Sequence, residues 1–265
     1  MIRTVTQADD VALHAYRSVG DPAALERAGL FVAEGRLIVE RLLEDGRFRV
    51  HSVAVTPPAA AALAATFERR RDVAVFVCPP QILREITGFD FHRGCLALGW
   101  RHESSGSIED LSLTTRLLAL EGIGNPDNVG GLFRTGFALG VDAVVLDDAT
   151  GDPLYRKAIR TSMGATLRVM FRRVADWPGG LSPLRDRGFR VIALTPHPDA
   201  VALDEIRVEP ADRIIVVAGS EGAGLRAGSL GYADVLVRIP VDPRADSLNV
   251  VVAAGIVLNA LRARS

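Results

Sequence analysis

Short apolar segments alternate with segments of helical pattern between residues 116 and 261, and this alternation is the strongest constraint on the fold. The apolar segments are RLLALEG, VDAVVLDD, TLRVMF, RVIALTP, RIIVVAG and DVLVRIP. Because they are apolar on both faces and helices separate several of them, they predict a parallel β-sheet covered on both sides. Ligands of such sheets bind beyond the carboxyl ends of the strands, so the residues after each strand are the first candidates for a site.

The N-terminal part, residues 1–104, predicts a separate and smaller α/β domain. Its segment 29–46, GLFVAEGRLIVERLLEDG, has apolar residues at helical spacing and predicts a helix that stops at Gly46. RVHSVAVTP, VAVFVCP and GCLALGW predict strands, and AAALAATFERRR predicts a helix between the first two. A stretch rich in Ser, Gly and Glu predicts a linker at 105–115, which makes 116–265 the second domain.

Composition excludes several classes of protein. The chain is 48% hydrophobic and 24% charged, as soluble globular proteins are. No apolar run reaches the roughly 18 residues of a membrane span, and no signal peptide is visible, so we expect a cytoplasmic protein with no membrane partner. A net charge of −1 argues against a uniformly basic nucleic-acid binder but not against a local basic patch. Cys78 and Cys95 lack metal-ligand or CxxC spacing, and we expect reduced packing cysteines and no metal site.

The first polar cluster, GNPDNVGGLFRTGFALG, follows the strand-like segment LLALEGI. Asp127 and Asn128 are placed to cap a helix, with Arg134 about one and a half turns further on. The buried side of this helix would carry Val129, Leu132, Phe133 and Phe137. Alone, the cluster fits a capped helix with one solvated arginine as well as it fits a ligand site.

The second cluster, SEGAGL, follows RIIVVAG. Gly219, Gly222 and Gly224 allow a sharp turn and a close approach to a ligand, and Glu221 places an acid within that turn. The order of the glycines is not that of the dinucleotide fingerprint GxGxxG, and the chain has no GxxxxGK[ST] phosphate loop. A tight turn without a ligand explains this cluster equally well.

The third cluster, VDPRADSLNVVVAAG, follows DVLVRIP. Ser247 is the predicted N-cap of an apolar helix. The apolar face of that helix would consist of Val250, Ala254, Val257, Leu258 and Leu261. Capping accounts for Ser247 but does not require Asn249, because Asn is a mediocre residue within the first turn of a helix.

Together the segments NPDNVGGLFRTG, VVAGSEGAGL and RIPVDPRADSLNVVVAAG resemble the three ordered motifs of the SpoU/TrmH family of the SPOUT class. These are S-adenosylmethionine-dependent RNA ribose 2′-O-methyltransferases. LFVAEGRLIVERLLEDG and GFDFHRGCLAL resemble the family's ribosomal-protein-like substrate-binding domain. The resemblance implies a parallel-sheet α/β methyltransferase domain with a C-terminal trefoil knot, preceded by a small α/β domain that binds RNA. Val241 and Pro243 stand where the family often has Met and Gly, which implies a differently shaped loop over the cofactor.

The resemblance also implies roles for individual residues. The cofactor, S-adenosylmethionine, would be held, largely through main-chain groups, by Leu194, Gly219, Glu221, Ile239 and Leu248. The catalytic positions would be Asn128, Arg134, Glu221, Ser247 and Asn249. Because an Arg side chain is almost never deprotonated, we expect Arg134 to bind a phosphate and stabilise the developing alkoxide. Asn128 and Asn249 would position Arg134 and the ribose.

The partners implied by the resemblance are a structured RNA, ribosomal or transfer, and a second copy of the chain bound through the knotted domain. The helix at 250–261, with Phe133 and Phe137, is the candidate interface, although the same residues fit a simple core. Dimerisation would also bring Arg134 of one subunit to the cofactor of the other. Arg36 and Arg93 lie where the family's RNA-binding domain presents charge. Two alternatives remain, namely a catalytically inactive knotted RNA-binding protein and a nucleotide-dependent doubly wound α/β enzyme.

Overall fold

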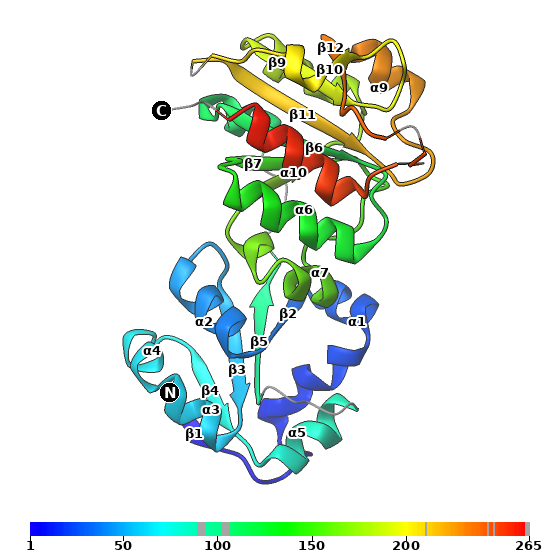
Figure 1. The fold of residues 1–265 in the computed structure, drawn as a ribbon. Helices are drawn as coiled ribbons and strands as arrows, with labels where there is room; N and C mark the ends of the chain where they lie inside the picture. Colours follow the sequence, from blue (N-terminus) through cyan, green and yellow to red (C-terminus); the bar gives the residue numbers. More distant parts are fainter. Residues whose placement is uncertain (89–93, 102–106, 210, 243, 246, 263–265) are drawn as a thin grey trace. The chain divides into compact units, whose positions relative to one another are not determined.

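The chain folds into two compact units (Figure 1). The computed structural model describes residues 1–88, 94–101, 107–209, 211–242, 244–245 and 247–262, so Arg93 and Pro243 lie outside the described residues. Unit 1 comprises Met1–His102 and Leu154–Arg168, and unit 2 comprises Glu103–Pro153 and Val169–Ser265. In the part of the chain that the structure describes, no helix has the length and apolarity needed to cross a membrane.

Unit 1 is an α/β unit built around a mixed sheet. Its described elements are β1 (Ile2–Thr4), the 3-10 helix η1 (Val11–Gly20), α1 (Pro22–Arg27), β2 (Leu30–Glu34), α2 (Arg36–Asp45), β3 (Val50–Val55), α3 (Pro57–Ala62), α4 (Ala64–Arg69), β4 (Ala74–Val77), α5 (Pro80–Thr87), β5 (Cys95–Trp100), α7 (Arg156–Thr161) and η3 (Ala165–Leu167). Within these residues the strand order is β1-β4-β3-β5-β2, parallel from β1 to β3 and antiparallel at β5 and β2.

Two sequence predictions for unit 1 need correction. The segment 29–46 was expected to be one helix, but its first part is strand β2 and only Arg36–Asp45 is helical. Gly35, at a φ of 96°, separates the two elements, and Gly46 ends α2 in the left-handed conformation, as predicted. The expected helix after β3 is divided into α3 and α4. The three predicted strands are confirmed as β3, β4 and β5.

The segment 154–168 belongs to unit 1, although it lies within the stretch that the sequence assigned to the second domain. Its helix α7 packs on β2, with Ala158 and Ile159 buried. Nη1 of Arg156 lies 3.5 Å from Oε2 of Glu34, and the guanidinium of Arg41 donates to the carbonyl of Met163. The two residues of each pair are 122 positions apart in the sequence, so no local pattern predicts these contacts.

The two cysteines lie in the interior of unit 1. Both are free thiols, and both are buried, which confirms the packing role expected from the sequence. Burial raises the pKa of Cys78 to about 11 and that of Cys95 to about 12, because an apolar environment disfavours the thiolate. Neither thiol is therefore suited to nucleophilic chemistry at neutral pH.

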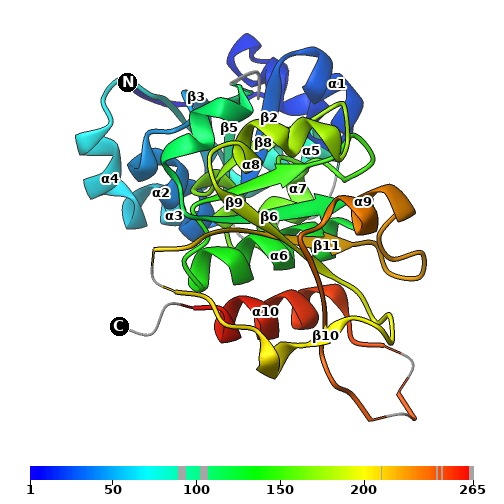
Figure 2. The same ribbon diagram turned by 90° about the horizontal axis from the view of Figure 1, so that it is seen from above.

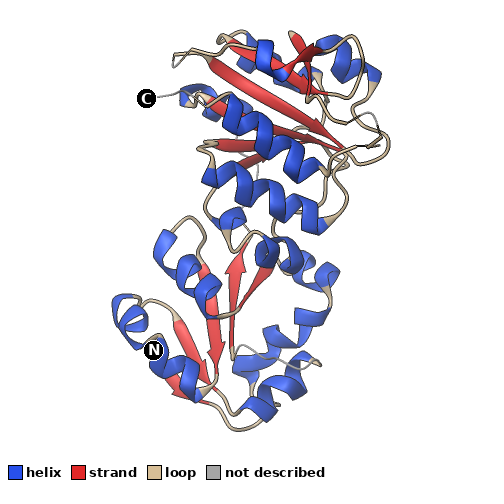
Figure 3. Cartoon of the chain, in the orientation of Figure 1, coloured by secondary structure: helices blue, strands red, loops and turns tan. Residues whose placement is uncertain are grey.

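Unit 2 contains the parallel sheet that the sequence predicted. Its described elements are η2 (Ile108–Leu113), β6 (Arg116–Glu121), α6 (Pro126–Ala138), β7 (Ala143–Leu146), β8 (Met170–Arg173), η4 (Gly179–Leu181), α8 (Ser182–Arg185), β9 (Phe189–Leu194), β10 (Val201–Ala202), η5 (Leu203–Glu205), β11 (Arg213–Gly219), α9 (Ala227–Tyr232), β12 (Val235–Arg238) and α10 (Val250–Ala260). Within these residues the strand order is β10-β12-β9-β11-β6-β7-β8, and each neighbouring pair is parallel. Figure 3 draws the strands in red and the helices in blue.

Helices cover both faces of this sheet because its strands are apolar on both faces. On one face, alternate residues of the strands, such as Leu117 and Ile215, pack with Leu111 of η2 and Leu184 of α8. On the other face α6 and α10 lie side by side (Figure 2), and Gly136 of α6 approaches Leu118. The carboxyl ends of β6 and β11 lie at the same level, since Glu121 pairs with Gly219 in the register.

Candidate functional site

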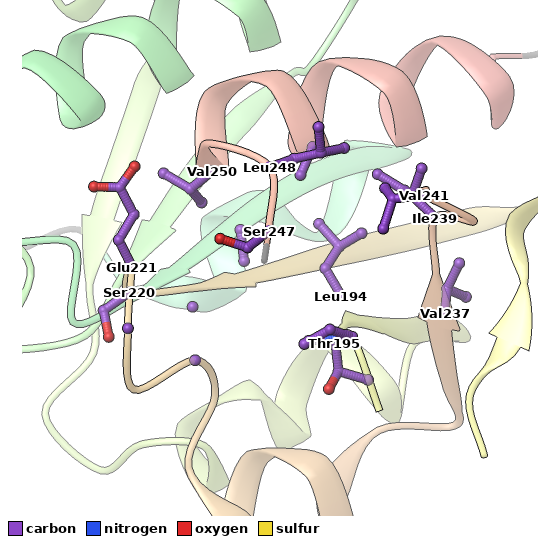
Figure 4. Close-up of a pocket in the computed structure, with 16 residues that line it drawn as sticks. Leu194, Thr195, Ser220, Glu221, Val237, Ile239, Val241, Ser247, Leu248 and Val250 are labelled. Atoms are coloured by element: carbon purple, nitrogen blue, oxygen red, sulfur yellow. The ribbon is translucent and has the colours of Figure 1, made fainter. Parts of the chain in front are cut away.

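A cavity of about 360 Å³ opens beyond the carboxyl ends of β9, β11 and β12 (Figure 4). The chain segments that follow these three strands, together with the start of α10, form its wall. The lining residues are Leu194, Thr195, Pro196, Ala218, Gly219, Ser220, Glu221, Gly222, Gly224, Val237, Ile239, Val241, Ser247, Leu248, Val250 and Ala253. The cavity therefore lies where ligands of open parallel sheets bind, and its volume suits a small organic ligand.

The walls of the cavity differ in character. Leu194, Val237, Ile239 and Leu248 present aliphatic side chains (Figure 4). The side chain of Glu221 is exposed at another side of the cavity and brings a carboxylate to it. Such a site can hold a flat apolar ring between the aliphatic groups and a positive charge near the carboxylate.

Gly219 ends β11 where the chain turns back on itself. A Cβ atom at this position would lie 2.6 Å from the carbonyl carbon of Gly224 and from the amide nitrogen of Leu225, and 2.7 Å from the oxygen of Gly224. The turn is closed by a hydrogen bond of 3.0 Å from the amide of Gly224 to the oxygen of Ser220. The close approach of backbone to backbone requires glycine at 219, as the sequence indicated.

The N-cap of α10 is Asn249, not Ser247 as the sequence predicted. The helix begins at Val250, and Oδ1 of Asn249 accepts a hydrogen bond of 2.9 Å from the amide of Val251. Ser247 lies two residues before the cap, is exposed, and lines the cavity instead. The capping role that the sequence assigned to Ser247 therefore belongs to Asn249.

The amide nitrogen of Asn249 joins the three polar clusters. Nδ2 donates to Oε1 of Glu221 at 2.6 Å and to Oδ1 of Asn128 at 3.2 Å. Asn128 is buried, with 8% of its surface exposed, and a buried amide oxygen needs such a donor. An N-cap Ser or Asp would satisfy the helix equally well but could not donate twice, and this explains why the position suits asparagine.

Helix α6 carries Asn128 and Arg134 on different faces. Its N-cap is Asn125, whose side chain accepts from the amide of Asp127 at 2.9 Å, so Asp127 and Asn128 lie within the first turn and not at the predicted cap. Val129, Leu132 and Phe133 are buried as expected, whereas Phe137 is 42% exposed. Arg134 is also exposed and makes no hydrogen bond or ion pair with the described residues. It does not line the cavity of its own chain.

Small residues bring α6 and α10 close enough for Asn128 and Asn249 to meet. A Cβ at Gly131 of α6 would lie 2.8 Å from Cγ2 of Val251, and a Cβ at Gly255 of α10 would lie 3.2 Å from Cγ2 of Thr135. A larger side chain at either position would force the helices apart.

Replacing Asn249 by Asp separates capping from site geometry. The carboxylate still caps α10, so we expect the midpoint of thermal unfolding to fall less than in Asn249→Ala, which also loses the cap. It cannot donate to Glu221 or Asn128, and its repulsion of the Glu221 carboxylate would displace that side chain from the cavity, so we expect ligand binding in the cavity to weaken about tenfold. Calorimetric titration and thermal unfolding of the same samples measure both. Asn249→Ala should lower both quantities, and equal ligand affinity in Asn249→Asp and wild type would contradict the assignment.

Two polar cavity residues were not singled out from the sequence. Thr195 follows β9 and Ser220 follows β11, so both obey the rule that directed attention to the carboxyl ends of the strands. The segment VIALTP ends in the same way as RIIVVAG, with a strand followed by a turn, so the same rule would have identified Thr195.

Among the described residues, no group of three or more His, Cys, Asp or Glu side chains is placed to hold a metal ion.

Comparison with known proteins identifies the family of this chain. The profile of the SpoU rRNA methylase family matches residues 115–259. An uncharacterised tRNA/rRNA methyltransferase of Mycobacterium tuberculosis is 36% identical, with 96% of this chain and 90% of the relative covered. The chain belongs to the SpoU rRNA methylase family.

Solved structures show the same fold as this SpoU chain. An rRNA methyltransferase from Sinorhizobium meliloti with bound AdoMet matches with a TM-score of 0.82 at 24% identity, covering 98% of this chain and 97% of that one. An RNA 2′-O ribose methyltransferase matches with a TM-score of 0.75 at 24% identity, covering 97% of each chain. The α/β fold and its parallel sheet are therefore those of the SPOUT methyltransferases, as the motifs indicated.

Proposed function

We propose that this SpoU methyltransferase transfers the methyl group of S-adenosylmethionine to a ribose 2′-hydroxyl of a structured RNA. RNA methylation with S-adenosylmethionine as cofactor is the chemistry of the family. The observation that carries the proposal is the amide of Asn249, which links the three motif segments at the rim of one cavity. The 2′-hydroxyl as acceptor rests on the motif resemblance and on the 2′-O ribose methyltransferase that shares the fold.

The residues of the cavity fit the cofactor. Ile239 and Leu248 would enclose the adenine ring between aliphatic side chains, with Leu194 beside them (Figure 4). Gly219 has no side chain, and its main-chain groups are free to approach the ring edge. Glu221 would lie near the positive end of the ligand, whose sulfonium supplies an electrophilic methyl group.

The polar residues would orient the nucleophile. A ribose 2′-hydroxyl is a poor nucleophile at neutral pH, so a site must position it and assist removal of its proton. Ser247, exposed at the cavity, would bind the ribose, and Asn249, whose amide is held by Asn128 and Glu221, would position it. Arg134 would bind the adjacent phosphate and stabilise the alkoxide, with a phosphate oxygen as the proton acceptor.

Arg134 would act on the cavity of a second subunit. It lies on the exposed face of α6 with Phe137, and the neighbouring helix α10 exposes Val252 (50%) and Ile256 (39%). These apolar side chains on adjacent helices form a surface suited to a second copy of the chain. A homodimer through this surface, in the knotted domain that the family resemblance implies, would carry Arg134 to the partner's cofactor.

We assign the recognition of RNA to unit 1. Arg36 is the first residue of α2, and Arg160 lies in α7. Both residues are exposed. Guanidinium groups of this kind bind phosphate oxygens, and structured RNA is recognised largely through its shape and backbone.

Mapping of ribose methylation tests the function. Total RNA from cells that lack the protein, with and without added protein and S-adenosylmethionine, should differ in 2′-O-methylation at one or a few nucleotides. Calorimetry on the purified protein should show S-adenosylmethionine binding. Binding without methylation would indicate an inactive RNA-binding protein, and methylation of a base would contradict the ribose assignment. Absence of binding would contradict the whole proposal.

A further inference from the structure

Glu121 is a buried carboxylate at the end of β6 that the proposed chemistry does not use. Its side chain is 3% exposed. Oε1 accepts a hydrogen bond of 2.6 Å from the amide of Arg226 and lies 3.2 Å from Nε of the same residue. Oε2 accepts from Nε1 of Trp177 at 2.5 Å and from the hydroxyl of Ser229. One carboxylate thus binds the chain after β8, the chain after β11, and helix α9.

A second buried carboxylate, Asp147, follows β7 and shares the guanidinium of Arg226. Its Oδ2 lies 2.9 Å from Nη2 of Arg226, and its side chain is 2% exposed. Its Oδ1 accepts from the amide of Gly122 at 3.0 Å and from the amide and hydroxyl of Thr150 at 2.9 and 2.7 Å. Arg226 therefore bridges the ends of β6 and β7, while Asp147 also holds the loop that leads from β6 into α6.

These contacts determine where the two catalytic loops lie. The loop 220–225 carries Glu221; it begins next to Gly219, the register partner of Glu121, and it ends at Arg226, which Glu121 binds. Both ends of this loop are thus fixed at one residue. The other loop, from Gly122 to the N-cap of α6, sets the position of Asn128 and is held by Asp147.

The surroundings of Arg226 argue against a role in binding RNA phosphate. Although its side chain is 58% exposed, its guanidinium faces two buried carboxylates, so their negative charge outweighs its own. A phosphate would be repelled from such a group, whereas a structural bridge between two carboxylates requires it.

We infer that Glu121 is a positioning residue of the methyl-transfer site. Acting with Asp147 through Arg226, it fixes the loop 220–225 and so holds Glu221 and Gly219 at the cavity. This inference rests on the proposed function and extends it to residues that touch neither the cofactor nor the ribose. Since active-site geometry is sensitive to shifts of about 1 Å, loss of the bridge should lower the rate of the bound complex and not only its stability.

The test compares Glu121→Gln and Arg226→Gln with a matched control, Asp142→Asn. Asp142 precedes β7, at the amino ends of the strands and so away from the cavity, and its carboxylate likewise accepts three hydrogen bonds, from the amides of Thr115 and Arg116 and the hydroxyl of Thr115. For each variant we would measure the thermal midpoint, the affinity for S-adenosylmethionine, and kcat and KM for RNA methylation.

Glu121→Gln and Arg226→Gln should each lower kcat and cofactor affinity about tenfold at a temperature where they are folded, with KM for RNA unchanged. Arg226→Lys, which keeps the charge, should recover part of the loss. Asp142→Asn should keep wild-type kcat whatever its thermal midpoint. Should Glu121→Gln not fold, Arg226→Gln decides the matter.

Two results would overturn the inference while leaving the function intact: wild-type kcat in both variants, or an equal loss of kcat in Asp142→Asn. A wild-type protein that binds no S-adenosylmethionine and methylates no RNA would overturn function and inference together. The wild-type assay and the ratio of variant to wild type therefore report on the two proposals separately.

Discussion

Replacing Arg134 by Ala is expected to lower the rate of methyl transfer about 1000-fold and to leave the affinity for S-adenosylmethionine nearly unchanged. The rate falls because the guanidinium would stabilise charge that develops on the 2′-oxygen and its phosphate. The affinity survives because Arg134 is not among the residues that line the cavity and would contact the RNA phosphate, not the cofactor. Single-turnover methylation and calorimetry measure the two quantities. Arg134→Lys should regain part of the rate, since it keeps the charge but not the bidentate geometry.

Arg190→Ala is the matched control for this prediction. Arg190 is also exposed and in unit 2, but it lies in the first half of β9, away from the carboxyl end of that strand. Its replacement should leave kcat within about twofold of wild type, as surface changes usually do. Full activity of Arg134→Ala would remove Arg134 from the mechanism.

The fold of unit 2 followed from its sequence because each buried strand is a short apolar run between helices. RIIVVAG and RVIALTP became β11 and β9, at the centre of the sheet where both faces are covered. The segment 29–46 shows where the same reasoning fails. Its strand β2 and helix α2 are both apolar and are separated by Gly35 alone, so a helical period extended across the whole segment.

Part of the candidate site could be predicted because ligands of parallel sheets bind beyond the carboxyl ends of the strands, and the sequence shows where each strand ends. The carboxyl ends of the strands identified Gly219, Glu221, Ser247 and Asn249, and the structure brings these segments to one cavity. The choice of cap was wrong because Ser247 and Asn249 are both good caps, and only the first helical φ and ψ angles decide between them. Glu121 was not predicted because its partners Arg226 and Ser229 lie 105 and 108 positions away in the sequence, beyond the reach of any local pattern.

Replacing Gly219 by Ala is expected to weaken binding of S-adenosylmethionine about 100-fold, equivalent to about 2.7 kcal/mol. The added methyl group would meet backbone atoms of Gly224 and Leu225 at 2.6 to 2.7 Å, and backbone cannot rotate away as a side chain could. Relief of this overlap must displace the loop 220–225, which forms one wall of the cavity. Isothermal calorimetry on the folded variant gives the affinity directly.

Gly231→Ala controls for the change from glycine to alanine itself. Gly231 lies in α9 of the same unit, and a Cβ there would meet no atom within 4 Å, so this variant should bind the cofactor as the wild type does. Wild-type affinity in Gly219→Ala would contradict the placement of the cofactor against the loop 220–225.

Arg134→Ala and Gly219→Ala, mixed in equal amounts at an S-adenosylmethionine concentration too low to fill the Gly219→Ala cavity, together test whether Arg134 acts across a dimer. Once subunits of Arg134→Ala and Gly219→Ala exchange, about half of the dimers are mixed, and each mixed dimer has one site with an intact cavity and an intact partner arginine. Methylation should then return to about a quarter of the wild-type rate. An arginine that acts within its own subunit predicts no recovery, because every site then lacks either the arginine or the cavity. Recovery would therefore establish both the dimer and the origin of the catalytic guanidinium.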